Sequence, residues 1–170
     1  APRLYDPALG GGALLDLGIY PVSFAAFVLG APSSVLAVGK LLENGVDQQV
    51  SALLGRFPDH PGAQALVNTT MRAATPVTAS ICGSQARIEL DSTFYGPGRV
   101  RLVGPSGASI SSEPPVVAGH LGLVYQAAHL AQLVADGFTE SPKLPLAESV
   151  AIMAILDEIR SQVGVRYPQE

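Results

Sequence analysis

Two polar side chains, Asp16 and Tyr20, lie in an otherwise apolar stretch near the start of the chain. Residues four apart on a helix share a face, so a helix here would bring the carboxyl and the phenol together. A carboxylate in apolar surroundings is costly unless it is paired or hydrogen-bonded. Two interpretations follow. Asp16 caps the backbone or holds Tyr20 in a buried structural pair, or Asp16 orients a hydroxylated substrate while Tyr20 moves a proton.

Motifs for other chemistries are absent from the sequence. It has no G-x-G-x-x-G dinucleotide fingerprint, no P-loop, no G-x-S-x-G nucleophile motif and no H-E-x-x-H zinc motif. His60, His120 and His129 are far apart and have no carboxylate at ligand spacing, so the sequence predicts no metal site. The single cysteine, Cys82, excludes an internal disulfide, and its apolar strand context predicts a core residue.

Composition limits the class of protein. The chain has 170 residues, of which 48% are hydrophobic and 14% charged, with a net charge of −4. This length predicts a single domain over residues 1–170, and the apolar content excludes a disordered chain. Ten Lys and Arg residues give no basic stripe of the kind that nucleic-acid binders need. The chain begins with Ala1 and shows no signal peptide, so we expect a cytoplasmic protein that is processed or part of a longer one.

Periodicity predicts the elements that position Asp16 and Tyr20. Residues 10–30 predict a helix that is kinked or broken at Pro21. The same run is apolar enough to be tested as a membrane span, but its Gly and Pro interruptions favour a helix buried in a core. Residues 33–112 alternate with period two between turn signals such as Glu43–Gly45. Residues 113–170 return to helical spacing, which predicts helices over His120–Ala135 and Leu146–Val163. We therefore expect an α+β fold, a large, mostly antiparallel open sheet with helices packed on one face.

The run from Gly10 to Tyr20 resembles the G-G-G-x-L-x-D-x-G-x-Y signature of the glucose–fructose oxidoreductase / inositol dehydrogenase family, in its dihydrodiol dehydrogenase-like branch. Other segments match in the same order along the chain. Gly45–Asp47 resembles a strand–turn element of the family, and Ile81–Leu90 resembles its G-T-x-G-x-I hairpin. Gly137–Glu148 resembles its G-x-x-E-S-P-x-x-P-L-x-E-S segment. The resemblance covers nearly the whole chain.

The resemblance implies a fold and a function. The family joins an N-terminal Rossmann domain that binds NAD(P) to a C-terminal substrate domain, and only the second is matched, so the dinucleotide-binding domain is missing here. It implies that Tyr20 is the catalytic acid/base and that Asp16 and Gly12 bind the substrate, a sugar, polyol or dihydrodiol. Tyrosine has an ordinary pKa of about 10, so a Lys of the missing domain is expected to lower it.

The same resemblance sets the expected cofactor and partners. NAD or NADP belongs to the full-length dehydrogenase, and this fragment is expected to bind neither and to be inactive alone. Its expected partners are the missing Rossmann domain, a small hydroxylated substrate and a second copy through the sheet face, with no nucleic acid and no membrane. The alternative is a non-catalytic dimerisation or binding module of the same fold, in which Asp16 and Tyr20 are merely structural.

Overall fold

The computed structural model describes residues 2–170, which form two compact units. One comprises Ala1–Ala73 with Leu144–Glu170, and the other comprises Ala74–Lys143. Antiparallel strands and helices confirm the predicted fold class. The strands divide into a three-stranded and a four-stranded sheet instead of one continuous sheet, because residues 71–78 pair with no strand. That residues 1–170 act as one substrate-binding domain stays a prediction.

The sheet of the first unit is an antiparallel meander of β1 (Ser34–Leu41), β2 (Asp47–Phe57) and β3 (His60–Thr70). The predicted turn before β2 forms at Gly45, which has a φ of +84° and donates its N–H to the Leu42 carbonyl oxygen at 3.0 Å. Period-two alternation then sends Val50 and Leu54 of β2 into the core.

The stretch that carries Asp16 and Tyr20 is one helical run in two geometries. A π-helical segment, η3 (Leu14–Gly18), leads directly into α1 (Ile19–Leu29). Pro21 lies in the first turn of α1, where its missing N–H removes the bond that a regular α-helix would make four residues back. The helix does not break at Pro21; the change from π to α geometry lies between Gly18 and Ile19, and the chain stays helical through Pro21.

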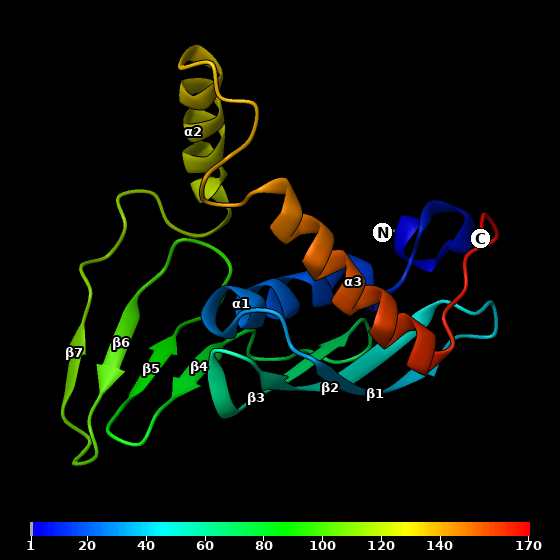
Figure 1. The fold of residues 1–170 in the computed structure, drawn as a ribbon, viewed down its shortest axis with the longest axis horizontal. Coiled ribbons are helices and arrows are strands. Elements are labelled where there is room, and N and C mark those ends of the chain that lie inside the picture. Colours follow the sequence, from blue (N-terminus) through cyan, green and yellow to red (C-terminus); the bar gives the residue numbers. More distant parts are fainter. Residues whose placement is uncertain (1) are drawn as a thin grey trace. The chain divides into compact units, whose positions relative to one another are not determined.

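Helices α1 and α3 (Leu146–Val163) cover one face of the three-stranded sheet (Figure 1). The bounds of α3 are those that the apolar spacing predicted. Side chains of both helices and of β2 share one core. Its fully buried members include Leu54, Leu156 and Ile159, each with no exposed surface.

The run Pro7–Leu29 is long and apolar enough to cross a membrane, by length and composition alone. In this structure its residues Leu14, Val22 and Ala25 are buried in the core with β2 and α3. This packing favours the interpretation as a core helix.

The second unit contains β4 (Ala79–Cys82), β5 (Arg87–Leu90), β6 (Val100–Val103) and β7 (Ser109–Ser111) in sequential antiparallel order. A short 3-10 helix, η4 (Gly119–Gly122), precedes α2 (Leu123–Ala135), so the predicted helix from His120 begins in 3-10 geometry. The prediction of Cys82 as a core residue is wrong. The side chain is exposed. Cys82 pairs directly with Arg87 across β4 and β5, so the two side chains lie on the same, polar face of the sheet.

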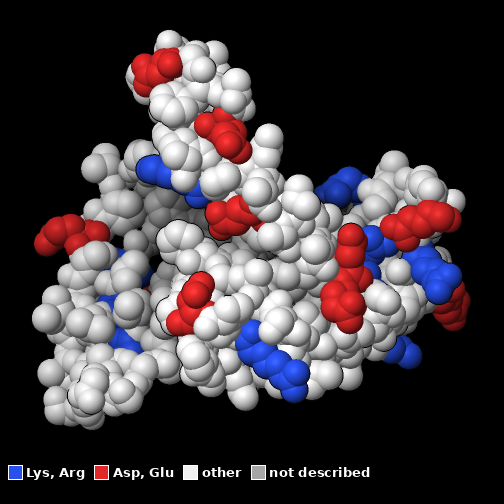
Figure 2. Space-filling view, viewed as in Figure 1, with Lys and Arg blue, Asp and Glu red and all other residues white. Residues whose placement is uncertain are grey.

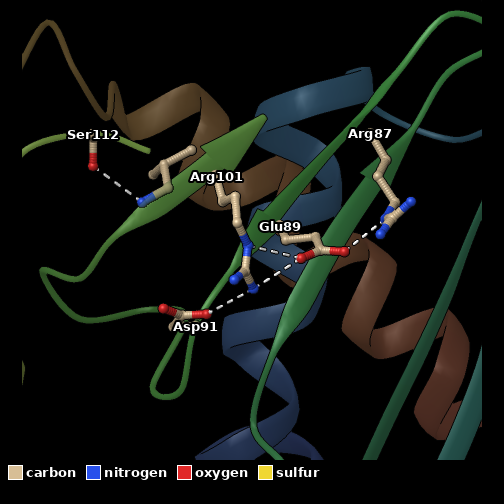
Figure 3. Close-up of polar contacts among 6 residues, drawn as sticks. Arg87, Glu89, Asp91, Arg101 and Ser112 are labelled. Carbon is tan, nitrogen blue, oxygen red and sulfur yellow. Dashed lines mark hydrogen bonds and ion pairs between the residues drawn. The ribbon is translucent and has the colours of Figure 1, made fainter. Parts of the chain in front are cut away.

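Glu89 binds two arginines on that polar face (Figure 3). Its carboxylate lies 2.6 Å from Nε of Arg87 and 2.9 Å from a guanidinium nitrogen of Arg101. The hydrogen bond from Arg87 lowers the pKa of Glu89 below its usual value. Asp91 also lies 3.5 Å from Arg101, so two carboxylates match the charges of these two arginines.

Candidate active site

Asp16 lies in the π-helical segment and forms an ion pair with Arg3. The side chain of Asp16 is 26% exposed, so the pair lies at the surface, where solvent screens it. The carboxylate is therefore paired without the burial that the structural interpretation assumed.

Tyr20 is the second residue of α1, and 39% of its surface is exposed. The four-residue spacing from Asp16 crosses the junction between π and α geometry, so ordinary helical spacing does not describe how the two side chains are related. Both side chains reach solvent in the first turns of one helical run. A phenol can donate or accept a proton, and a carboxylate accepts hydrogen bonds from hydroxyl groups. The combination suits a small hydroxylated ligand.

Two of the glycines before this helix, Gly11 and Gly12, have no room for side chains. A Cβ on Gly11 would lie 2.7 Å from the Leu4 carbonyl oxygen. Gly12 has a φ of +133°, and a Cβ there would overlap Oδ1 of Asp47. Gly12 is buried, so a contact with substrate would have to pass through its backbone. That binding role stays a prediction.

Three side chains from three elements hold this glycine-rich segment. Asp47 is the first residue of β2, Thr69 lies at the end of β3, and Tyr167 follows α3. We call these three residues the helix anchor. They bring the start of the helical run against the sheet and against the C-terminal residues of the chain.

Two members of the helix anchor bind adjacent residues at the helix start. Oδ2 of Asp47 accepts a hydrogen bond from the backbone N–H of Leu14 at 2.6 Å. The hydroxyl of Thr69 donates to the carbonyl oxygen of Ala13 at 3.0 Å. A carboxylate at a helix N-terminus also interacts favourably with the helix dipole. The first turn is therefore fixed through both a donor and an acceptor of its backbone.

The third member, Tyr167, donates its hydroxyl to the carbonyl oxygen of Gly11 at 2.9 Å. The guanidinium of Arg160 stacks over the Tyr167 ring at 4.7 Å from its centroid and pairs with Asp157 and Glu170. Burial raises the pKa of Tyr167, and the charge of Asp47 raises it further. The phenol therefore keeps the proton that it donates to Gly11.

Asp47 is a fully buried carboxyl group with no exposed surface. Within residues 2–170, its Oδ1 atom has no hydrogen-bond partner and packs against Gly12. Burial raises the pKa of Asp47 above its usual value of 3.8, while the N–H of Leu14 and the charge of Arg160 oppose this shift. Burial raises the pKa more than these interactions lower it, so ionisation of Asp47 lowers the stability of the fold.

A glycine-rich turn before a helix can cradle the phosphates of a dinucleotide, but this one does not fit them. The N–H groups of Gly11 and Gly12 donate to backbone carbonyl oxygens at 2.9 and 3.0 Å. The N–H of Leu14 is bound by Asp47, whose carboxylate would repel a phosphate. The helix start is thus occupied by an anion of the protein itself.

Other ligand classes find little support in the part of the chain that the structure describes. Among residues 2–170, no group of three or more His, Cys, Asp and Glu side chains is placed to hold a metal ion. On the face drawn in Figure 2, basic and acidic side chains are interspersed and form no basic stripe.

Sequence reasoning missed the structural role of Asp47 and Tyr167. Asp47 was noted only within the Gly45–Asp47 strand–turn element. The available signal was an acidic residue at the start of an alternating strand, directly after the buried Val46. Its partner at the helix start lies 33 residues earlier, so no local pattern connects them.

The chain has recognisable relatives over nearly its whole length. Residues 1–89 match the family model of the GFO/IDH/MocA C-terminal domain. The chain is 38% identical to the trans-1,2-dihydrobenzene-1,2-diol dehydrogenase of Xenopus laevis over 173 residues, which is 98% of this chain and 51% of that protein. Identity to the dehydrogenase of the same name from Homo sapiens is 34% over 176 residues, or 99% of this chain and 51% of that one. The chain therefore spans about half the length of the curated relatives it matches.

Solved structures share the fold. A 3-ketoreductase from Actinomadura kijaniata, in complex with NADP and TDP-benzene, aligns with a TM-score of 0.76 at 25% identity, covering 95% of this chain and 49% of that one. The aldose–aldose oxidoreductase of Caulobacter crescentus, complexed with glycerol, aligns with a TM-score of 0.77 at 23% identity, covering 96% of this chain and 49% of that one. The second likeness is one of fold alone.

Substitution of Gly12 by Ala is expected to destabilise the first unit strongly, because its Cβ would overlap the buried Asp47 carboxylate at a positive φ. We expect a loss of roughly 3 kcal/mol or more in the free energy of unfolding, measured by urea denaturation. Gly10→Ala is the matched control, since Gly10 has a φ of +65° but open space around it. Its loss should be about 1 kcal/mol. Equal losses would contradict the packing described here.

Substitution of Asp47 by Asn is expected to change how stability depends on pH. The folded-state pKa of Asp47 is raised, so its contribution to stability is present at low pH and is lost as pH rises above 3.8. The amide of the Asp47→Asn variant cannot ionise, so the stability of the variant relative to wild type should increase with rising pH over that range. Urea denaturation at a series of pH values measures the difference.

The lowered pKa values of Glu89 and Glu170 act in the opposite direction but are common to both proteins. A difference that does not vary with pH would contradict the assignment.

Proposed function

The chain belongs to the GFO/IDH/MocA family as a C-terminal domain, and from this premise we propose that it is the substrate-side domain of an NAD(P)-dependent oxidoreductase acting on CH–OH groups. A sugar, a polyol or a dihydrodiol is the proposed substrate. The observation that carries the proposal is the exposure of Asp16 and Tyr20, the two polar residues of the signature, at a helix start that is fixed against the sheet.

Tyr20 is proposed to transfer the proton of the reacting hydroxyl group. Tyr20 is 39% exposed, so part of its side chain is accessible from solvent. A phenol with a pKa of about 10 is a poor proton acceptor at neutral pH unless a cation stabilises the phenolate. We expect the family's Lys, supplied by the other half of the protein, to provide that charge.

Asp16 is proposed to orient the substrate. Carboxylate oxygens accept two or more hydrogen bonds, so Asp16 can bind vicinal hydroxyl groups while it remains paired with Arg3. Hydrogen bonds to a carboxylate are stronger than those to a neutral acceptor. Backbone contacts of Gly12 with the substrate are part of the same proposal.

The coenzyme is proposed to bind to the half of the protein that this chain does not contain. The nicotinamide would supply the hydride chemistry when bound, and the residues of this chain handle the substrate and its proton. The occupied helix start supports this division, because it offers no site for the phosphates. We therefore propose that the isolated chain is inactive, and a cytoplasmic location remains part of the same hypothesis.

Substitution of Tyr20 by Phe in the full-length protein is expected to reduce kcat by about 100-fold or more, because the proton acceptor is lost. Turnover would be measured spectrophotometrically with NADP or NAD and trans-1,2-dihydrobenzene-1,2-diol, D-xylose or D-glucose. Coenzyme affinity, followed by fluorescence titration with NADPH and NADH, should stay within about twofold. Tyr5→Phe is the control, since Tyr5 is also an exposed tyrosine near the start of the chain. Unchanged turnover in Tyr20→Phe would favour the non-catalytic module.

A second role, association of two copies, is favoured by the outer face of the three-stranded sheet. Leu36, Leu53 and Leu66 are paired across β1, β2 and β3 in a single row. They lie on the face away from the core, and Leu36 and Leu66 are 64% and 85% exposed. Burial of such a row against a second copy would remove much apolar surface from water. We propose that this leucine row is the centre of a homodimer interface.

Substitution of Leu66 by Glu is expected to weaken the dimer at least tenfold, or about 1.4 kcal/mol, because a charge would enter its apolar centre. Sedimentation equilibrium from low to high micromolar concentration measures the change. Gln64→Glu is the matched control, since it adds the same charge to the same face of β3, two residues from Leu66. A wild-type protein that stays monomeric at high micromolar concentration would refute the interface.

A further inference from the structure

We propose that Asp47 is a positioning residue for the reaction, since it fixes the start of the helical run that carries Asp16 and Tyr20. This inference rests on the proposed function of those two residues. It goes beyond that function by assigning their orientation to a buried group that touches neither substrate nor coenzyme.

The first step is the connection between Asp47 and the site. Its carboxylate binds the N–H of Leu14, the first residue of the π-helical segment, at 2.6 Å. Asp16 lies two residues further along, and Tyr20 lies on the same helical run. Rotation or translation of the first turn would therefore move both side chains together.

The second step is the rigidity of this connection. Asp47 is wholly buried, and its second oxygen packs against Gly12, whose missing side chain allows the close approach. Thr69 binds the Ala13 carbonyl oxygen, so the adjacent peptide is also fixed. A Cβ on Gly18 would lie 3.2 Å from Cγ2 of Thr69, which shows that the end of the π-helical segment also packs on this side chain. Both ends of the segment that contains Asp16 are thus held by the sheet.

The third step is the chemical choice of a carboxylate. A neutral amide could also accept a hydrogen bond from the N–H of Leu14, whereas burial of an unneutralised acid lowers stability. A charged acceptor makes a shorter and more directional bond to an N–H group than a neutral contact does. The carboxylate of Asp47 therefore fixes the geometry of the helix start while its burial lowers the stability of the fold.

The test compares Asp47→Ala and Asp47→Asn in the full-length protein with its coenzyme. Asp47→Ala should lower kcat at least tenfold, on the order expected for misplacement of a catalytic group, while coenzyme affinity stays within about twofold. Asp47→Asn keeps an oxygen that can accept from Leu14, so it should recover kcat to within about threefold of wild type. Rescue by Asn would tie kcat to the hydrogen bond that Leu14 donates, and measurement at a temperature where every variant is folded separates this effect from a loss of stability.

Phe57→Ala is the matched control for stability. Phe57 is buried at the opposite end of β2 from Asp47, so its loss should destabilise the unit without moving the helix start. Its kcat should equal that of wild type at a temperature where both proteins are folded. If Asp47→Ala does not fold, Thr69→Val removes the neighbouring bond of the helix anchor and should lower kcat in the same way.

The outcomes separate this inference from the proposed function. Loss of turnover in Tyr20→Phe with unchanged kcat in folded Asp47→Ala, or in Thr69→Val, would overturn the positioning role and leave the proposed function intact. Equal kcat losses in Asp47→Ala and Phe57→Ala would also overturn it. Unchanged turnover in Tyr20→Phe would instead refute the proposed function, and the positioning role with it.

Discussion

Burial of one carboxylate at the start of a helix is the constraint on which the first unit depends. Asp47 can lie there only because Gly12 has no side chain, and its charge is opposed by burial and supported by a helix N-terminus. Arg160 of α3 adds a favourable charge and stacks on Tyr167, which holds the preceding glycine. Residues from the two separate parts of the sequence that form this unit therefore meet at the same point.

Much of the fold could be predicted because local patterns determine it. Apolar spacing gave the limits of α3, and alternation with turn residues gave antiparallel strands. The division into two sheets was missed because strand alternation does not reveal which strands pair. Cys82 was placed in the core because an apolar neighbourhood in sequence was taken for burial, whereas the end of a short strand lies open.

The candidate site shows the same limit. Asp16 and Tyr20 could be found because they lie close together in an apolar run. The pairing of Asp16 with Arg3, 13 residues away, and the bond between Asp47 and Leu14 depend on tertiary contacts. A glycine-rich turn before a helix can leave space either for a bound phosphate or for a carboxylate of the protein itself. Only the position of Asp47 distinguishes an anion-binding turn from one that already contains its anion.

The π-helical geometry of Leu14–Gly18 restricts the length of the polypeptide at this point. A π turn holds one more residue between bonded partners than an α turn does, and each residue of an α-helix turns the chain by about 100°. Since the start of the run is held by the sheet, gain or loss of one residue there would swing Tyr20 to another side of the helix. A substitution at an exposed position of this segment changes one side chain, but a change in its length would redirect every side chain that follows.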